Sequence, residues 1–290
     1  MRVAVVGAGL MGVGIGLGFC QYGAHVTYLV HGRHARPRAE RAVGEAAAEL
    51  VDLGVAEAGF ADRVVYCGVV TELPGCDLII ESIPEQRDLK LAILAELATA
   101  QPRALLCTNT SSLGITALGA DLHRPQRFAG LHFWYPAPLM PLVELVPGQR
   151  TDPTAMVEIE QIVRQHGKIP IVLARDIPGF VWNRLVVAVL REAASLVEQG
   201  VVSARDIDLV VEHGLARRWS LTGPFASAVL GGVPTFETVG ANLLPLLDQR
   251  TSLDALTELL AGYAPDRAAL SAWRDRRLAE RDDSTTWGQP

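Results

Sequence analysis

The sequence has little lysine and no surplus of positive charge. Of its 26 lysine and arginine residues, only Lys90 and Lys168 are lysines, and the formal net charge is −6. A nucleic-acid-binding domain would show a basic footprint, so this charge balance argues against nucleic acid as a partner. We attribute the preference for arginine to genome composition rather than to chemistry.

Cysteines are also few, and they are not paired in the sequence. Cys20, Cys67, Cys76 and Cys107 stand apart, without a CxxC spacing. The pattern predicts neither a zinc site nor a disulfide framework, and it is typical of a reducing cytoplasm. We expect all four to be small buried residues of strands and helices.

A long uninterrupted apolar run is missing as well. The uncharged stretch 3–20 follows Met1-Arg2 but contains six glycines. A membrane helix needs about 20 predominantly apolar residues, and no small-residue cleavage site follows this stretch. We interpret it as a buried strand, a turn and a close-packed helix, and we expect a cytoplasmic protein without a membrane or targeting segment.

What the sequence does contain is an alternation of short apolar runs and amphipathic stretches. The 290 residues are 49% hydrophobic and 20% charged, enough for two domains with sizeable cores. Over 1–177 the pattern predicts strands at 2–6, 25–30, 63–68, 77–82, 104–111, 128–134, 142–146 and 168–174, and helices at 10–22, 36–53, 88–98 and 152–165. Such alternation is typical of a doubly wound parallel sheet of the Rossmann type, an α/β fold whose ligands bind at the carboxyl ends of the strands.

The character of the chain changes after the segment 176–180, which contains Pro178-Gly179. We therefore predict a dinucleotide-binding domain over 1–177 and an all-helical domain for substrate binding and dimerisation over 178–290. The predicted helices of this second domain are 181–198, 204–212, 225–230, 235–244, 252–260 and 266–281.

A GxGxxG motif follows the first predicted strand and opens the first predicted helix. It consists of Gly7, Gly9 and Gly12, with Leu10 and Met11 between the last two. The first glycine allows a tight turn, the second lets a pyrophosphate approach the backbone, and the third lets the helix pack on the strand. The motif predicts dinucleotide binding.

The acid that usually accompanies this motif is absent. An NAD site normally carries a carboxylate at the end of the second strand, but here Val30 is followed by His31, Gly32 and Arg33. An arginine at this place can hold a 2′-phosphate, so we expect NADP to be favoured over NAD. The alternative is that the basic turn is only solvated.

Polar side chains follow several of the predicted strands and would meet at one edge of the sheet. They include Glu85 and Lys90, the segment 109–112, His132 and Glu144, while Asn183 opens the second domain. A carboxylate beside an imidazole fixes its tautomer and raises its pKa, as a general base near neutral pH needs. A histidine satisfied in the core is the alternative for His132 alone, and the neighbouring polar residues favour the catalytic interpretation.

Taken together, these motifs resemble those of the 3-hydroxyacyl-CoA dehydrogenases. The matching segments, in family order, are GAGLMG, ESIPE with LK, NTSSL, GLHFWYPAPLMPLVELV, GKIPIVLARDIPGFVWNR, DIDLVVEHGLARR and TGP. The resemblance implies a homodimer in which His132 is the catalytic acid/base and Glu144 its partner. It further implies that Ser111 bonds the reacting oxygen and Asn183 supports the substrate pocket, and that the cofactor contacts include Asn109, Glu85 and Lys90.

The sequence departs from the family pattern in two places. Tyr135 replaces the asparagine of the family's HFxNP segment, so we expect Tyr135 to reshape the substrate side of the pocket. The acid that the family carries after its second strand is also missing, and the second predicted strand instead resembles that of the ketopantoate reductases, which use NADPH. The C-terminal half looks more like the L-gulonate and carnitine dehydrogenase branch.

Three functions remain open on these grounds. The first is hydride transfer between a nicotinamide cofactor and the 3-hydroxy or 3-keto group of an acyl thioester, carried by CoA or a carrier protein. The second is a dehydrogenase of a small free 3-hydroxy acid, and the third is a non-enzymatic, crystallin-like dinucleotide-binding protein. The complete set of Ser111, His132, Glu144 and Asn183 argues against the third.

Overall fold

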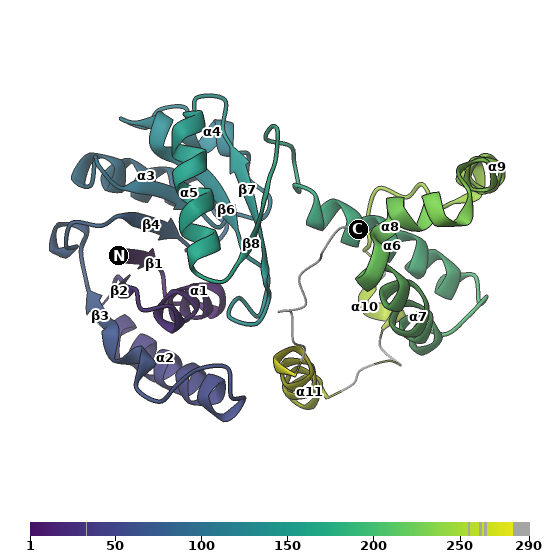
Figure 1. Cartoon of the computed structure of the whole chain (residues 1–290), viewed down its shortest axis with the longest axis horizontal. Coiled ribbons are helices and arrows are strands. Elements are labelled where there is room, and N and C mark those ends of the chain that lie inside the picture. The colour runs from purple at the N-terminus through teal and green to yellow at the C-terminus, as the bar shows by residue number, and fades with distance from the viewer. Residues whose placement is uncertain (33, 255, 261–262, 264–265, 281–290) are drawn as a thin grey trace. The chain divides into compact units, whose positions relative to one another are not determined.

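The computed structural model describes residues 1–32, 34–254, 256–260, 263 and 266–280 (Figure 1). Their contacts form two compact units, one of residues 1–181 with 271–280 and one of residues 182–270. Three positions used in the predictions lie outside the described residues. They are Arg33, residue 255 of the predicted helix 252–260 and residue 281 of the predicted helix 266–281.

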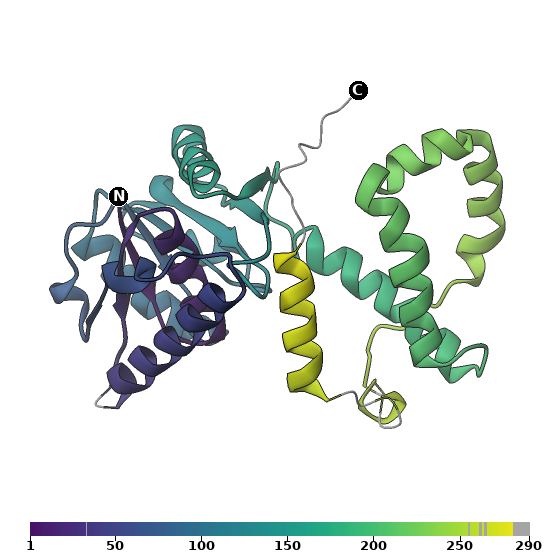
Figure 2. The same ribbon diagram turned by 60° about the horizontal axis from the view of Figure 1, so that its bottom comes forward.

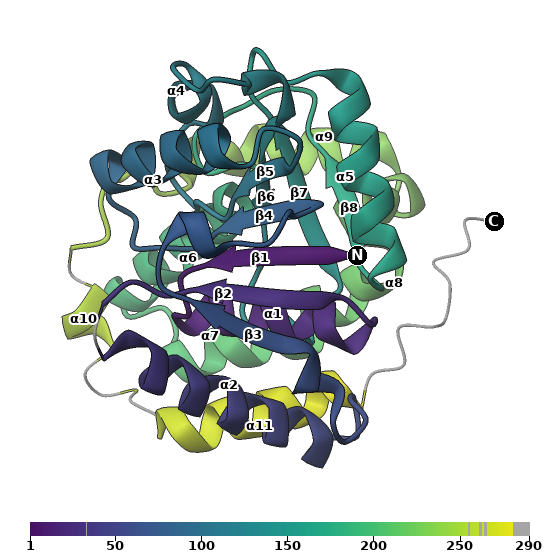
Figure 3. The same cartoon turned by 90° about the vertical axis from the view of Figure 1, so that its left-hand side faces the viewer.

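An eight-stranded sheet forms the centre of the first unit, with β1 between β2 and β4 (Figure 3). The strand order is β3-β2-β1-β4-β5-β6-β7-β8. The strands are β1 Arg2–Val6, β2 His25–Leu29, β3 Val64–Cys67, β4 Leu78–Glu81, β5 Leu105–Thr108, β6 Phe128–His132, β7 Leu142–Pro147 and β8 Ile169–Val172. The chain starts in the middle of the sheet and winds outward on both sides, which confirms the predicted Rossmann-type fold.

The last two strands run against the others. Neighbours are parallel from β3 to β6, whereas β7 is antiparallel to β6 and parallel to β8. A parallel connection needs a crossover of about a dozen residues or more. The segment 133–141 between β6 and β7 is shorter than that, so it forms a hairpin loop and the sheet is not parallel throughout.

Alternating strand residues divide the core between the two faces of the sheet. Val3 and Val5 of β1 pack with α1 (Leu10–Gln21), α2 (Ala35–Asp52) and α5 (Pro153–Gln165). Ala4 and Val6 face the side covered by α3 (Arg87–Ala100) and α4 (Ile115–Gly119). The period of two follows from strand geometry, and strands buried on both faces explain the continuous apolar runs in the sequence. The helix α4 was not predicted because its 5 residues are too few to show a helical period.

The segment that joins the two units belongs to the first. Phe180 is 1% exposed within the core on the α3 side, and the N–H of Val181 bonds to Glu144. The division therefore falls after residue 181, four residues later than the predicted boundary at 177/178. Residues 271–280 also group with the first unit, where the Arg274 guanidinium lies over the ring of Tyr135.

The described residues of the second unit are helical, with no strand among them (Figure 2). Its elements are α6 Trp182–Glu198, α7 Ala204–Val210, the π-helical turn Val211–Leu215, α8 Ala216–Gly231, α9 Val233–Leu243, the 3-10 turn Leu244–Leu246 and α10 Leu256–Leu259, followed by the start of α11 Arg267–Ala279. The predicted helices 204–212 and 225–230 are parts of one helical stretch that is kinked at Gly223, where φ is 62°.

No helix within the described ranges has the length and apolar character needed to cross a membrane. The four cysteines are buried and unpaired. Cys20, Cys67 and Cys107 lie in α1, β3 and β5 as predicted, whereas Cys76 lies in the loop before β4 and not in a strand or helix. No group of three or more His, Cys, Asp or Glu side chains suited to a metal ion occurs in the described part of the chain.

Candidate active site

The glycine-rich turn between β1 and α1 is fixed by backbone geometry. Gly7 has a φ of 99°, and a Cβ added there would lie 2.7 Å from the Ser82 carbonyl oxygen. A Cβ at Gly12 would lie 2.0 Å from the Gly7 carbonyl oxygen. A Cβ at Gly9 would meet no atom within 4 Å, so the space in front of it is open to a ligand. The turn thus fits the pyrophosphate of a dinucleotide.

A cavity of about 890 Å³ opens at this turn, at the carboxyl edge of the sheet. Its size is that of a small-molecule site, about 300–1,000 Å³. The lining residues are Val6, Gly7, Ala8, Gly9, Leu29, Val30, His31, His34, Ala35, Arg38, Ala39, Gly68, Val69, Val70, Ser82, Ile83, Pro84, Leu89, Ala92, Ile93 and Glu96. The segment after β2 contributes His31, His34 and Arg38 to this lining, and no carboxylate from its described residues.

Two predicted cofactor contacts lie beside this cavity rather than in its lining. Leu10 is 63% exposed and lines a neighbouring cavity of about 440 Å³, together with Gly9 and Tyr135. Met11 is partly buried against the core. Arg33 stays a prediction outside the described residues.

His132 and Glu144 are direct partners across the antiparallel strands β6 and β7. His132 Nδ1 lies 2.8 Å from Glu144 Oε2, and the two residues are 3% and 1% exposed. The carboxylate thus sets the proton of the neutral ring on Nδ1. Nε2 then carries the lone pair, and it lies 3.2 Å from Ser111 Oγ.

A strained turn holds the other oxygen of Glu144. Phe180 has a φ of 49°, a left-handed conformation that is uncommon for residues other than glycine. Its ring lies 5.4 Å from the His132 ring, and the next N–H, from Val181, donates to Glu144 Oε1 at 2.8 Å. The carboxylate is therefore oriented through both of its oxygens.

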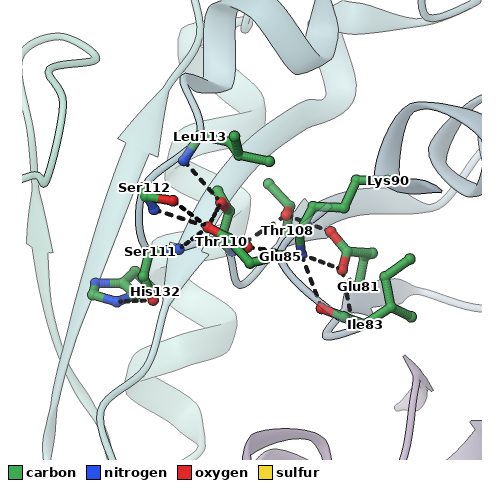
Figure 4. Close-up of polar contacts among 10 residues, drawn as sticks. All are labelled: Glu81, Ile83, Glu85, Lys90, Thr108, Thr110, Ser111, Ser112, Leu113 and His132. Atoms are coloured by element: carbon green, nitrogen blue, oxygen red, sulfur yellow. Dashed lines mark hydrogen bonds and ion pairs between the residues drawn. The ribbon is translucent and has the colours of Figure 1, made fainter. Parts of the chain in front are cut away.

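Glu85 holds the loop that carries Ser111 (Figure 4). Its Oε1 accepts bonds from the backbone N–H groups of Ser111 and Ser112, at 3.0 and 2.9 Å, and from the hydroxyls of Thr110 and Ser112. Burial raises the pKa of this carboxyl, but these bonds and the charge of Lys90 outweigh it and lower the pKa to about 2. Glu85 is thus an anion that orders the Ser111 loop.

Lys90 and Asn109 are also bound to other protein groups. Lys90 is 1% exposed, with its Nζ 2.6 Å from Glu81 Oε1 and 3.3 Å from Glu85 Oε2. Asn109 Oδ1 accepts the N–H of Phe133, the residue after His132, at 2.8 Å. The structure places Lys90 with Glu85 in the network under the Ser111 loop (Figure 4), while Asn109 holds the residue after His132. Neither Lys90 nor Asn109 lines the larger cavity.

The remaining predicted site residues lie on the β6–β7 loop and in the second unit. Tyr135 is 42% exposed, and the Arg274 guanidinium of α11 lies 4.7 Å from the centre of its ring. Asn183 lies in the first turn of α6 in the second unit.

Sequence reasoning missed the roles of Glu81 and Phe180. Glu81 ends the buried strand β4, accepts the Thr108 hydroxyl at 2.6 Å, and is 0% exposed. For Glu81 the sequence held a usable signal: it is a lone acid at the end of an apolar run, nine residues before Lys90, one of only two lysines. No comparable signal marked the positive φ of Phe180.

A ligand-sized cavity at a glycine-rich turn and a Ser–His–Glu chain along the same sheet edge define a nicotinamide-dependent oxidoreductase of the Rossmann class. The NAD binding domain of the 3-hydroxyacyl-CoA dehydrogenases matches residues 2–177, and the C-terminal domain of these enzymes matches residues 179–243. The chain belongs to the 3-hydroxyacyl-CoA dehydrogenase family, which confirms the resemblance noted in its motifs.

Relatives within the family act on different substrates. The 5-formyl-3-hydroxy-2-methylpyridine 4-carboxylate 5-dehydrogenase of Mesorhizobium japonicum is 29% identical over 96% of both chains. A crystal structure of an enzyme with this activity, described as an NAD+ dependent dismutase, has a TM-score of 0.86 at 28% identity and 96% coverage of both chains. The L-carnitine dehydrogenase of Streptomyces coelicolor is 35% identical over 80% of this chain and 73% of its own. The (S)-3-hydroxybutyryl-CoA dehydrogenase structure from Ralstonia eutropha has a TM-score of 0.69 at 31% identity, covering 74% of this chain and 77% of its own.

Proposed function

We propose that the protein oxidises a hydroxyl group, or reduces the corresponding carbonyl, with His132 as the acid/base. The observation that carries the proposal is the chain from Glu144 through His132 to Ser111, with links of 2.8 and 3.2 Å. In oxidation, His132 Nε2 accepts the hydroxyl proton, and in reduction it returns that proton to the oxygen. Glu144 stabilises the imidazolium, and the Ser111 hydroxyl bonds the reacting oxygen. We include Asn183 as a further contact to the substrate.

A nicotinamide cofactor supplies the hydride acceptor or donor of this reaction when it is bound. The backbone of the 7–12 turn would hold its pyrophosphate, which the open space before Gly9 supports. For the adenosine end we propose a preference for NADP over NAD. His31, His34 and Arg38 line the cavity after β2, and none of the described residues that line it from this segment is a carboxylate that would repel a 2′-phosphate.

For the substrate we favour a small free acid over an acyl thioester. The sequence motifs alone put the thioester first. A relative that covers 96% of the chain bears the name of a pyridine carboxylate, and a structure with that activity has a TM-score of 0.86. A 3-hydroxyacyl-CoA dehydrogenase structure from Archaeoglobus fulgidus also covers 96% of the chain, with a lower TM-score of 0.73. The family's C-terminal domain match ends at residue 243, so α11 and Arg274 lie beyond it. Arg274 lies over Tyr135, three residues after His132, which supports a site that differs from that of the CoA enzymes.

A substrate panel with both cofactors tests the proposal. It comprises acetoacetyl-CoA, a carrier-bound 3-ketoacyl group, carnitine, gulonate and 5-formyl-3-hydroxy-2-methylpyridine 4-carboxylate. We expect the highest kcat/KM with a free acid. A higher kcat/KM with either thioester would reverse the substrate assignment. If wild type binds the dinucleotide but turns over none of these compounds, the result would favour a non-enzymatic role.

We also propose a cytoplasmic homodimer. The second unit leaves large apolar side chains exposed, among them Phe225 at 87%, Leu221 at 77% and Leu230 at 76%. Exposed apolar patches of this kind mark interaction surfaces, and the four unpaired cysteines are typical of a reducing compartment. Light scattering should give twice the chain mass of 31.2 kDa, and a monomer at micromolar concentration would contradict the proposal.

A further inference from the structure

Lys168 is the second of only two lysines, and it makes an unusual set of contacts. Its Nζ donates to three backbone carbonyl oxygens, those of Ala137, Pro138 and Met140, at 2.7, 3.0 and 2.9 Å. No ion pair within the described ranges includes Lys168. The side chain is thus a partly buried cation whose charge is met by backbone dipoles alone.

All three carbonyls lie in the loop that joins the two catalytic strands. The loop leaves β6 at His132 and enters β7 two residues before Glu144. Lys168 directly precedes β8, where Ile169 pairs with Leu142 and Ile171 with Glu144. The contact therefore ties the loop to the strand beside Glu144.

The geometry requires an ammonium group. Three N–H bonds diverge from one nitrogen, so a single lysine can serve three carbonyls that surround a point. The planar fork of arginine directs its donors differently and is bulkier. In a chain that uses arginine almost everywhere, the retained lysine is explained by this local geometry.

We propose that Lys168 is a positioning residue that clamps the 137–140 loop and so keeps His132 aligned with Ser111 and Glu144. The inference rests on the proposed function, because its effect is exerted through the His132 acid/base step. Asn109 holds the other side of the same loop through Phe133 N–H, at 2.8 Å.

The clamp should loosen in mildly alkaline solution. Desolvation lowers the pKa of Lys168 to about 8, and the neutral amine has only two N–H groups for three carbonyls. Besides Lys168, the titratable side chain that lines the small cavity beside it is His166, the residue after α5. Tyr22, the residue after α1, contacts the His166 ring. Burial lowers the pKa of His166, and the positive charge of the Met1 amine lowers it further. His166 therefore titrates at a lower pH than Lys168.

The test combines kinetics with lysine side-chain NMR. Because the chain has two lysines, 13Cε-lysine labelling gives two signals, and Lys168→Arg assigns them. We expect the Lys168 signal and the alkaline limb of kcat for oxidation to share one midpoint in wild type. Lys168→Met should remove that limb and lower kcat on the order of 10–100-fold with little change in KM, as misplacement of about 1 Å does. Arg164→Met is the matched control, since it removes an exposed cation of α5 that is paired with Glu160 on the same helix.

The outcomes separate the two proposals. An unchanged kcat and pH profile in Lys168→Met, or wild-type midpoints that differ between NMR and kinetics, would overturn the clamp. The midpoint comparison needs only wild type, so it holds even if the variant folds poorly. If wild type turns over no substrate, the proposed function fails instead, and the clamp is then judged by the His132 ring signals, which should shift in Lys168→Met but not in Arg164→Met.

Discussion

The cofactor region and the catalytic region of the first unit are built in different ways. Around β1, β2 and β4, backbone shapes the cavity: Gly7 takes a positive φ, and Gly12 leaves no room for a methyl group. Around β5, β6 and β7, buried polar side chains hold one another, as in the 2.8 Å contact of His132 with Glu144. The first region should therefore fail when atoms are added, and the second when a functional group is removed.

Removing the imidazole should give the largest effect and separate the two regions most clearly. We expect His132→Ala to lower turnover by roughly 10²–10⁴-fold, the usual contribution of a positioned acid/base. The dissociation constant of the dinucleotide should hardly change. Near-normal turnover would contradict the role of His132, and equal loss of dinucleotide binding would show that the regions are not separable.

Adding a methyl group should damage the cofactor region in a position-dependent way. In Gly12→Ala the new Cβ meets the Gly7 carbonyl oxygen at 2.0 Å, so we expect a loss of about 1–3 kcal/mol in unfolding free energy. Gly9→Ala is the matched variant, since its Cβ meets nothing within 4 Å. It should keep the Tm and weaken only dinucleotide binding, as calorimetry can show. Equal Tm values for the two variants would refute this account of the turn.

The basic segment after β2 should decide between the two cofactors. A partly exposed arginine–phosphate contact contributes about 1.5–3 kcal/mol, which is roughly 10–150-fold in preference. We expect wild type to favour NADPH over NADH in kcat/KM and Arg33→Ala to lose much of that preference. Arg36→Ala is the control, because Arg36 is paired with Glu40 at 2.8 Å. A clear NADH preference that Arg33→Ala leaves untouched would defeat the NADP assignment.

The Glu85 network should make the thermal stability of the protein depend on pH in the acidic range. We expect this effect to be smaller than those of the preceding variants. The pKa of Glu85 is lowered from 4.5 to about 2 in the folded state. Its stabilising contribution is therefore complete above about pH 4.5 and is lost as the pH falls toward 2. Glu85→Gln should flatten the fall of Tm across this range, whereas Glu57→Gln, an exposed carboxylate outside the network, should not. Parallel Tm curves for wild type and Glu85→Gln would exclude Glu85 as the cause.

Much of the fold and part of the site could be predicted from the sequence, because both have local signals. Glycine spacing marked the 7–12 turn, and apolar runs marked the strands whose ends carry Ser111 and His132. The antiparallel β6–β7 register that pairs His132 with Glu144 is a tertiary feature. So is the bond from Glu85, after β4, to the loop after β5. Such contacts join residues distant in sequence, and no local pattern records them.

The central claim is that Glu144 and His132 act as one acid/base unit. The most direct test is the pH–rate profile of Glu144→Gln beside that of wild type, with dinucleotide binding measured on the same samples. An amide keeps the size of the carboxylate but removes its charge, so the imidazolium loses its stabilisation. We predict lower turnover, a shifted histidine-dependent limb and unchanged dinucleotide affinity. A pH–rate profile identical to that of wild type would remove Glu144 from the mechanism and contradict the account.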